Sequence, residues 1–108
     1  MTAKKKIFKT AVAQEPLEFE LDGETFIAIA PNRLPGNVLI SYVEDVTEGK
    51  VYVGHKKFFE KALVKDSAEK FAERLDSNEN PINLQQMIEV AEWLVNEYSA
   101  FTVGDEAK

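Results

Sequence analysis

The sequence predicts an α+β fold that is mostly α: an N-terminal β-hairpin followed by about four helices. Apolar and polar residues alternate on both sides of an Asp-Gly pair near the start of the chain. Farther on, apolar residues recur three and four positions apart in separate segments as far as Tyr98. Strand and helix patterns are therefore segregated along the chain, whereas in βαβ folds they alternate.

Composition divides the 108 residues into an arm, one domain and a tail. Residues 1–15 are predicted to be a flexible basic arm that contains Lys4, Lys5, Lys6 and Lys9. Residues 16–103 carry the periodic patterns and suit a single domain, and residues 104–108 are expected to be a loose polar tail. The arm is interpreted either as a solvated terminus or as a docking arm for an acidic partner, such as another copy of this chain.

The hairpin is predicted from residues 17–30. Residues 17–21 alternate strictly, with the apolar side chains on one face. Asp22 and Gly23 suit a two-residue turn in which both residues have positive φ. The return strand begins at Glu24, and Pro31 ends it. Because a lone hairpin is only marginally stable in water, its apolar face should pack on the helices or its edge should pair with another chain.

Two helices are predicted next. Asn37 is a suitable N-cap for a helix that runs to about Thr47, and Gly49 suits its C-terminal cap. The inward residues of this helix are expected to be Leu39, Tyr42, Val43 and Val46. Residues 50–53 favour a strand locally but are also compatible with the start of a helix. From His55 to about Val64 the pattern is helical, with an inward set of Phe58, Phe59, Ala62 and Leu63.

A third helix is predicted to end at about Leu75. Asp66 followed by Glu69 is close to a capping box that would open it. Alternating charges, including Glu73 and Arg74, indicate ordinary support between residues four apart on an exposed face. A polar loop then leads to the last helix.

The last helix carries the widest apolar face. Asn83 and Gln86 are placed for a capping box, and Ile82 and Met87 for a hydrophobic staple. The helix is predicted to end near Tyr98, with an inward stripe of Leu84, Met87, Ile88, Ala91, Leu94, Val95 and Tyr98. Val90 and Trp93 widen this stripe, which indicates a second packing neighbour.

The sequence shows no arrangement of residues suited to catalysis or metal binding. It has no cysteine and a single histidine, His55, which is expected at the surface near the start of a helix. A zinc site would need carboxylate ligands, and the nearest acid, Glu60, lies at an unsuitable helical spacing. Acidic pairs such as Glu89 and Glu92 are interpreted as solvated, and the five glycines form no phosphate loop. We therefore predict no enzyme activity, no cofactor and no metal.

Charge and hydropathy limit the partners. Thirteen basic and nineteen acidic residues give a net charge of −6, which disfavours binding to nucleic acid. No apolar run is long enough to span a membrane, and the apolar stretches of the N-terminus are too short for a signal peptide. A soluble cytosolic protein that binds other proteins is the prediction.

Large apolar side chains make up the candidate surface for a partner or for self-association. Trp93 is assigned either to the core or to an interface, where tryptophan is enriched. Phe58 and Phe59 point about 100° apart on a helix, so one ring can be internal while the other serves an interface. The complete candidate set is Phe19, Leu21, Phe26, Phe58, Phe59, Val90, Trp93 and Tyr98.

A series of short motifs runs in a fixed order through residues 17–98. The motifs are Phe19-Glu20-Leu21-Asp22-Gly23, Leu34-Pro35-Gly36, Phe58-Phe59, Lys70-Phe71-Ala72-Glu73-Arg74-Leu75, Asn80-Pro81-Ile82 and Glu89-Val90-Ala91-Glu92-Trp93-Leu94-Val95-Asn96-Glu97-Tyr98. As an ordered set they resemble the tail assembly chaperone family of long-tailed bacteriophages, in the short form found in phages of actinobacteria. That family commonly continues with a Gly-Arg-Pro-Thr-like tail, where this chain has Ser99-Ala100-Phe101-Thr102-Val103.

The resemblance implies a function without chemistry. Such proteins bind the tape measure protein, a long and largely helical chain, keep it soluble and help tail tube subunits assemble around it. It further implies a homo-oligomer in the host cell cytoplasm, contacts with the tail tube protein and with a longer frameshifted form of the same product, and absence from the mature virion. The alternatives are a small structural virion subunit for the tail or for head completion, and an acidic protein-binding adaptor.

Overall fold

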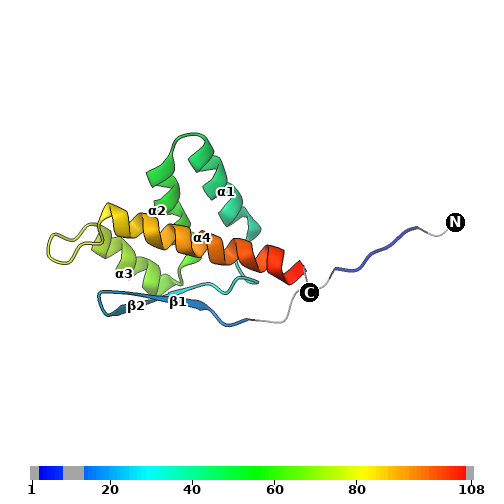
Figure 1. Cartoon of the computed structure of the whole chain (residues 1–108), viewed down its shortest axis with the longest axis horizontal. Coiled ribbons are helices and arrows are strands. Elements are labelled where there is room, and N and C mark those ends of the chain that lie inside the picture. Colours follow the sequence, from blue (N-terminus) through cyan, green and yellow to red (C-terminus); the bar gives the residue numbers. More distant parts are fainter. Residues whose placement is uncertain (1–2, 9–13, 107–108) are drawn as a thin grey trace.

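The structure is a computed structural model that describes residues 3–8 and 14–106, with side chains as far as Ala100. Its elements are β1 (Leu17–Leu21), β2 (Glu24–Ala28), α1 (Gly36–Thr47), α2 (Val51–Ala62), α3 (Lys65–Leu75) and α4 (Leu84–Glu106). The predicted fold class, a hairpin followed by helices, is confirmed. The hairpin lies on one side of α4, and α1 and the first turns of α2 rise on the other (Figure 1).

The hairpin forms as its turn sequence requires. Asp22 and Gly23 have φ of 50° and 83°, the two positive values of a type I′ turn. The strands pair antiparallel from Leu17 opposite Ala28 to Leu21 opposite Glu24. The return strand is therefore slightly shorter than the predicted one.

The outer edge of β2 is covered by the connection between α2 and α3. The Ile27 carbonyl oxygen accepts a hydrogen bond from Val64 N at 3.0 Å, and Ile29 N donates to the Ala62 oxygen at 2.7 Å. Ile27 N donates to Ser67 Oγ at 2.8 Å. Because Val64 is held in this bridge with extended φ and ψ, α3 begins directly after it at Lys65. The predicted Asp66 cap is wrong, since Asp66 lies inside the first turn and makes no capping bond.

Of the other predicted helix caps, two are confirmed and one is wrong. Asn83 and Gln86 form the predicted capping box: Gln86 N donates to Asn83 Oδ1 at 2.8 Å, and Asn83 N donates to Gln86 Oε1 at 3.0 Å. Gly49 takes the positive φ, 83°, expected after the end of α1. The predicted Asn37 cap is wrong, because α1 begins at Gly36 after Pro35 without a side-chain capping bond.

Two segments are more helical than the sequence indicated. Residues 51–53 are the first turn of α2, which settles the strand-or-helix alternative. α4 continues to Glu106, so the predicted end near Tyr98 is wrong, and residues 104–106 of the expected loose tail are helical. Gly104 interrupts this run but costs a helix only about 1 kcal/mol. Residues 107–108, and residues 1–2 and 9–13 of the expected arm, lie outside the described residues.

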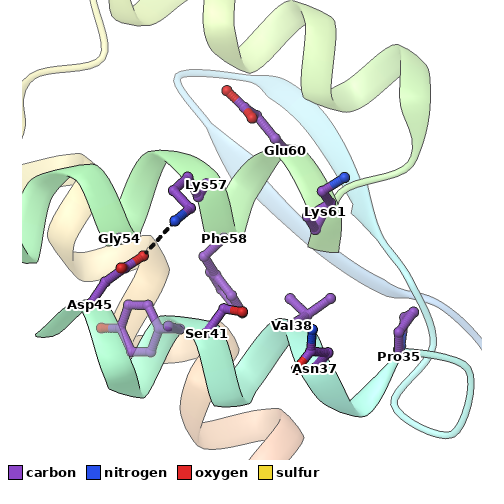
Figure 2. Close-up of a pocket in the computed structure, with 11 residues that line it drawn as sticks. Pro35, Asn37, Val38, Ser41, Asp45, Gly54, Lys57, Phe58, Glu60 and Lys61 are labelled. Carbon is purple, nitrogen blue, oxygen red and sulfur yellow. Dashed lines mark ion pairs between the residues drawn. The ribbon is translucent and has the colours of Figure 1, made fainter. Parts of the chain in front are cut away.

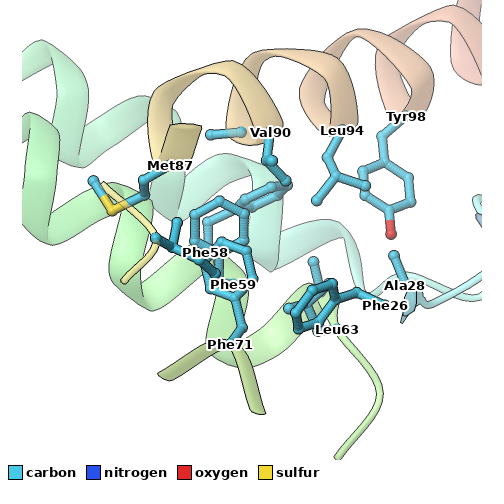
Figure 3. Close-up of a cluster of buried hydrophobic side chains, with 13 residues drawn as sticks. Phe26, Ala28, Phe58, Phe59, Leu63, Phe71, Met87, Val90, Leu94 and Tyr98 are labelled. Carbon is cyan, nitrogen blue, oxygen red and sulfur yellow. The ribbon is translucent and has the colours of Figure 1, made fainter. Parts of the chain in front are cut away.

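Aromatic rings from the hairpin, α2, α3 and α4 build the core (Figure 3). The rings of Phe59 and Phe71 lie 4.4 Å apart between centroids, and Phe26 packs edge-on against Phe71 at 5.5 Å. Leu94 and Tyr98 of α4 close the cluster from above the hairpin (Figure 3). Tyr98 Oη donates a hydrogen bond of 2.7 Å to the Ile29 carbonyl oxygen, which fixes α4 to the end of the hairpin.

Arg74 joins α3 to the hairpin turn. Only 7% of this residue is exposed, and its guanidinium contacts Asp22 Oδ2 at 2.8 Å and Glu24 Oε1 at 3.3 Å. Its Nε also donates to the Asn80 carbonyl oxygen at 3.0 Å. The interpretation of Arg74 as part of an exposed charge pattern along one helix is therefore wrong, because its partners lie about 50 residues earlier in the hairpin and six residues later in the loop after α3.

Candidate functional site

Most residues of the predicted partner surface lie inside the domain. Phe26, Phe58, Phe59, Val90 and Tyr98 are all buried. Their side chains fill the space between the hairpin and the helices, so a partner of the folded chain does not reach them. Both rings of the Phe58–Phe59 pair are internal, and the assignment of one ring to an interface is corrected.

The remaining three predicted residues lie nearer the surface. Phe19 and Leu21 are half-buried on the inner face of β1. Trp93 is 38% exposed on α4 and packs edge-on against Phe19, with 6.2 Å between ring centroids. The structure thus combines the two alternatives for Trp93: one side of the indole supports the hairpin, and the other faces solvent.

A different set of apolar side chains is exposed. The members, here named the α1–α2 apolar surface, project from two consecutive helices and are Ile40, Val43, Val46, Tyr52 and Val53. Ile40 and Val43 are each 57% exposed, and Tyr52 and Val53 are each 54% exposed. The placement of Val43 and Val46 in the core is therefore corrected.

The α1–α2 apolar surface arises because α1 is apolar on more than one face. Its half-buried residues Val38, Leu39 and Tyr42 pack toward the core, and α1 contributes no fully buried residue. Ile40 and Val43 lie on the opposite side, where no other described element covers them. The sequence signal for this surface is an excess of apolar residues over one packing stripe in α1, the same signal that Val90 and Trp93 give in the last helix.

A groove of about 420 Å³ separates α1 from α2 (Figure 2). Val38, Tyr42 and Phe58 supply apolar lining. At one end Lys57 Nζ lies 3.1 Å from Asp45 Oδ2, an ion pair whose angles do not make a hydrogen bond. The groove narrows there because α1 and α2 approach closely at Gly54, where an added Cβ would lie 2.9 Å from Asp45 Cβ.

A second groove, of about 460 Å³, lies where α2, α3 and the start of α4 meet. Tyr52 and Leu84 stand at its rim, each at least half exposed, and Ile82 and Met87 line its base. Leu84 was predicted to face inward, and this is corrected. Tyr52 thus belongs both to the α1–α2 apolar surface and to the rim of this groove.

Burial raises the pKa of two tyrosines, Tyr42 and Tyr98. Burial raises the pKa of Tyr98 to about 12. The pKa of Tyr42 is also raised, first by burial and then by the negative charge of Glu92 on α4. Both phenols are neutral and able to donate hydrogen bonds at neutral pH, and the shifts extend the neutral form to higher pH.

His55 is a packing residue. It is 3% exposed, and its Nδ1 lies 2.6 Å from the Val51 carbonyl oxygen one turn earlier. Because a carbonyl oxygen only accepts, Nδ1 carries the proton. The ring also meets Tyr42 edge-on at 5.5 Å. The prediction of a surface histidine is wrong, since the early start of α2 moves His55 into the second turn and onto the α1-facing side.

Within the described residues, no three His, Cys, Asp or Glu side chains are grouped closely enough to hold a metal ion. Over the same part of the chain, every helix is too short or too polar to cross a membrane. Comparisons with protein-family models, with curated proteins and with solved structures find no match to this chain.

Proposed function

We propose that this protein is a non-enzymatic tail assembly chaperone that binds the phage tape measure protein through the α1–α2 apolar surface. The observation that carries the proposal is that surface: five large apolar side chains stay exposed on one helix pair while the rest of the domain has a well-packed aromatic core. A holdase needs such a surface because its client is a helical chain that exposes apolar side chains before assembly. The tape measure protein is proposed as the client because the ordered motifs from Phe19 to Tyr98 resemble those of tail assembly chaperones.

Charge supports the same role. The net charge of −6 keeps a complex with an apolar client dispersed. Charges on α1 are confined to Glu44 and Asp45, and Asp45 is turned toward Lys57 of α2. Glu44, four residues after Ile40, is therefore the one charge that α1 places beside Ile40 and Val43 on its outer side. In this proposal the protein acts in the host cytoplasm as an oligomer, promotes assembly of tail tube subunits around the client, and is absent from the mature virion.

Co-expression with the tape measure protein from the same genome tests the proposal. The tape measure protein is expected to be soluble and to co-purify only when this chain is present. Val43→Asp should abolish that rescue without lowering the melting temperature, because Val43 is exposed and its loss costs the fold little. Asn96→Asp is the matched control, since it adds the same charge at an exposed position of α4.

Equal rescue by the Val43→Asp and Asn96→Asp variants would reject the α1–α2 apolar surface as the client site. Failure of the unmodified chain to solubilise the tape measure protein, together with its recovery from purified virions, would favour the structural-subunit alternative.

A further inference from the structure

No described residue pairs with the outer edge of β1, in contrast to that of β2. Leu21 and Glu24 close the two-residue turn as a hydrogen-bonded pair, and such pairs alternate along an antiparallel ladder. The N–H and C=O groups of Glu18 and Glu20 therefore point away from β2. Among the described residues none forms a hydrogen bond to these four groups. On β2, by comparison, the equivalent groups of Ile27 are both bonded.

The open edge is acidic. Glu18 and Glu20 are exposed, Glu15 precedes them, and Asp22 stands at the turn. No lysine or arginine occurs between residues 14 and 21. An exposed strand edge with this charge is protected against pairing with most neutral or acidic segments, but it attracts a basic one.

The basic segment of the N-terminal arm, residues 3–8, forms no hydrogen bond or ion pair with the rest of the described chain, although Gln14 at the end of the arm donates its N–H to Asn32 Oδ1 at 3.3 Å. It has no helix or strand over residues 3–8 and leads away from the body of the molecule (Figure 1). Ile7 and Phe8 are 68% and 82% exposed, next to Lys4, Lys5 and Lys6. Residues 1–13 carry a charge of +4 and the remainder of the chain −10, so the arm and the edge are complementary.

We propose that residues 4–8 of one copy add as a third strand to the β1 edge of a second copy. The four open backbone groups of Glu18 and Glu20 would then be paired. In an extended segment Lys4, Lys6 and Phe8 lie on one face and Lys5 and Ile7 on the other. Either orientation therefore brings a large apolar side chain to the side of α4, where Trp93 is partly exposed, and lysines to the glutamates.

This contact is directional. Each copy offers one donor arm and one acceptor edge, so the interface is heterologous and builds a ring or an open chain. The strand addition would be the interface of the oligomer named in the proposed function. Only its biological role depends on that proposed function. Its test uses the purified chain alone, so that loss of assembly and loss of client binding are separate results.

Sedimentation velocity over a range of protein concentrations tests the contact. The full chain is expected to show a weight-average mass that rises with concentration and falls when salt is raised from about 0.05 M to about 0.5 M. Deletion of residues 2–8 should leave a monomer at every concentration. A monomeric full chain, or undiminished association after the deletion, would overturn the proposal.

Two edge variants separate strand addition from general charge attraction. Glu18→Pro removes an outward N–H that the hairpin ladder does not use, so the variant should fold and stay monomeric. Should its melting temperature fall, Glu18→Lys combined with Glu20→Lys tests the same edge without proline. Glu69→Lys combined with Glu73→Lys on the exposed side of α3 is the charge-matched control and should associate like the unmodified chain. Equal loss of association in the edge and control variants would contradict the assignment of the edge.

Engineered cysteines identify the donor and acceptor, because the chain has none of its own. Ile7→Cys and Phe8→Cys place a thiol on each of the two faces of the extended arm, so one of these two variants, mixed with a chain with Glu20→Cys, should form an interchain disulfide under mild oxidation. Glu73→Cys in place of Glu20→Cys should form it far more slowly. In a single chain that carries both the reactive arm cysteine and Glu20→Cys, a bond that stays intrachain at high protein concentration would show that the arm folds back on its own edge and would refute the proposal.

Discussion

Replacement of Arg74 by methionine removes the one cation that joins the hairpin turn, α3 and the following loop. The variant keeps the length of the side chain and loses the contacts to Asp22, Glu24 and the Asn80 carbonyl oxygen. The Asp22 and Glu24 side chains are 55% and 35% exposed, so water can solvate both carboxylates once Arg74 is gone. Each of these pairs therefore contributes about 0.5–1 kcal/mol, in the range of partly exposed pairs.

The hydrogen bond from Arg74 Nε adds more, because a bond from a buried charged donor contributes about 1.5–3 kcal/mol. Together the losses lower the free energy of unfolding by about 2.5–5 kcal/mol, a large share of the about 5–15 kcal/mol typical of a domain. For a domain of this length the melting temperature should fall by about 10–20 °C.

Urea unfolding measures this change with two signals. Fluorescence of Trp93, which packs against Phe19 of the hairpin, reports docking of the hairpin, and far-UV circular dichroism reports the helices. Lys70→Met is the matched control: Lys70 lies one turn earlier, reaches the same hairpin through Thr25, and has a side chain that is 45% exposed. It should cost less than about 1 kcal/mol.

A double-mutant cycle of Arg74→Met with Asp22→Asn should give a coupling of about 1 kcal/mol, and asparagine tolerates the positive φ at that position. If Arg74→Met costs no more than Lys70→Met, the assignment of Arg74 as the buried link between hairpin and helices is refuted.

Two further predictions concern contacts between distant elements. Tyr98→Phe should cost about 1–2 kcal/mol at neutral pH through loss of the hydrogen bond to Ile29, while Tyr52→Phe, at an exposed site, should cost almost nothing. Folding raises the pKa of Tyr98 from 10.0 to about 12, so the stabilisation from its neutral form is complete below pH 10 and is lost as the pH rises toward 12. Unfolding curves from pH 8 to pH 12 should therefore decline less steeply for Tyr98→Phe than for the unmodified chain, and parallel curves would contradict this. Gly54→Ala should destabilise by about 1–3 kcal/mol despite the better helix propensity of alanine, because its Cβ would meet Asp45 Cβ at 2.9 Å. Gly36→Ala, where nothing lies within 4 Å, is the control for a thermal melt, and equal melting temperatures would show that α1 can shift at no cost.

Local sequence was sufficient where a feature depends on neighbours within a few residues. The Asp22-Gly23 turn and the Asn83–Gln86 capping box were both predicted and both form. The number and order of the helices also follow from periodicity. Each of these features is specified by backbone conformation or by hydrogen bonds over a short stretch, so residue type and spacing determine them.

The start of α3 and the burial of His55 required the tertiary structure. α3 begins at Lys65 because Val64 pairs with Ile27, a residue 37 positions earlier. His55 is buried because α2 begins early and turns it toward Tyr42. No local pattern contains this information, since the partner that decides each case is distant in sequence.

The candidate surface also depends partly on local sequence and partly on tertiary structure. Sequence alone determined that this chain is an acidic, cysteine-free, mostly helical domain with more apolar side chains than one core stripe needs. It did not determine which of them remain outside: Phe58, Phe59 and Tyr98 are buried, whereas Ile40 and Val43 are exposed. Only the tertiary structure decided this, because periodicity identifies the apolar face of a helix but exposure depends on which other element packs against that face.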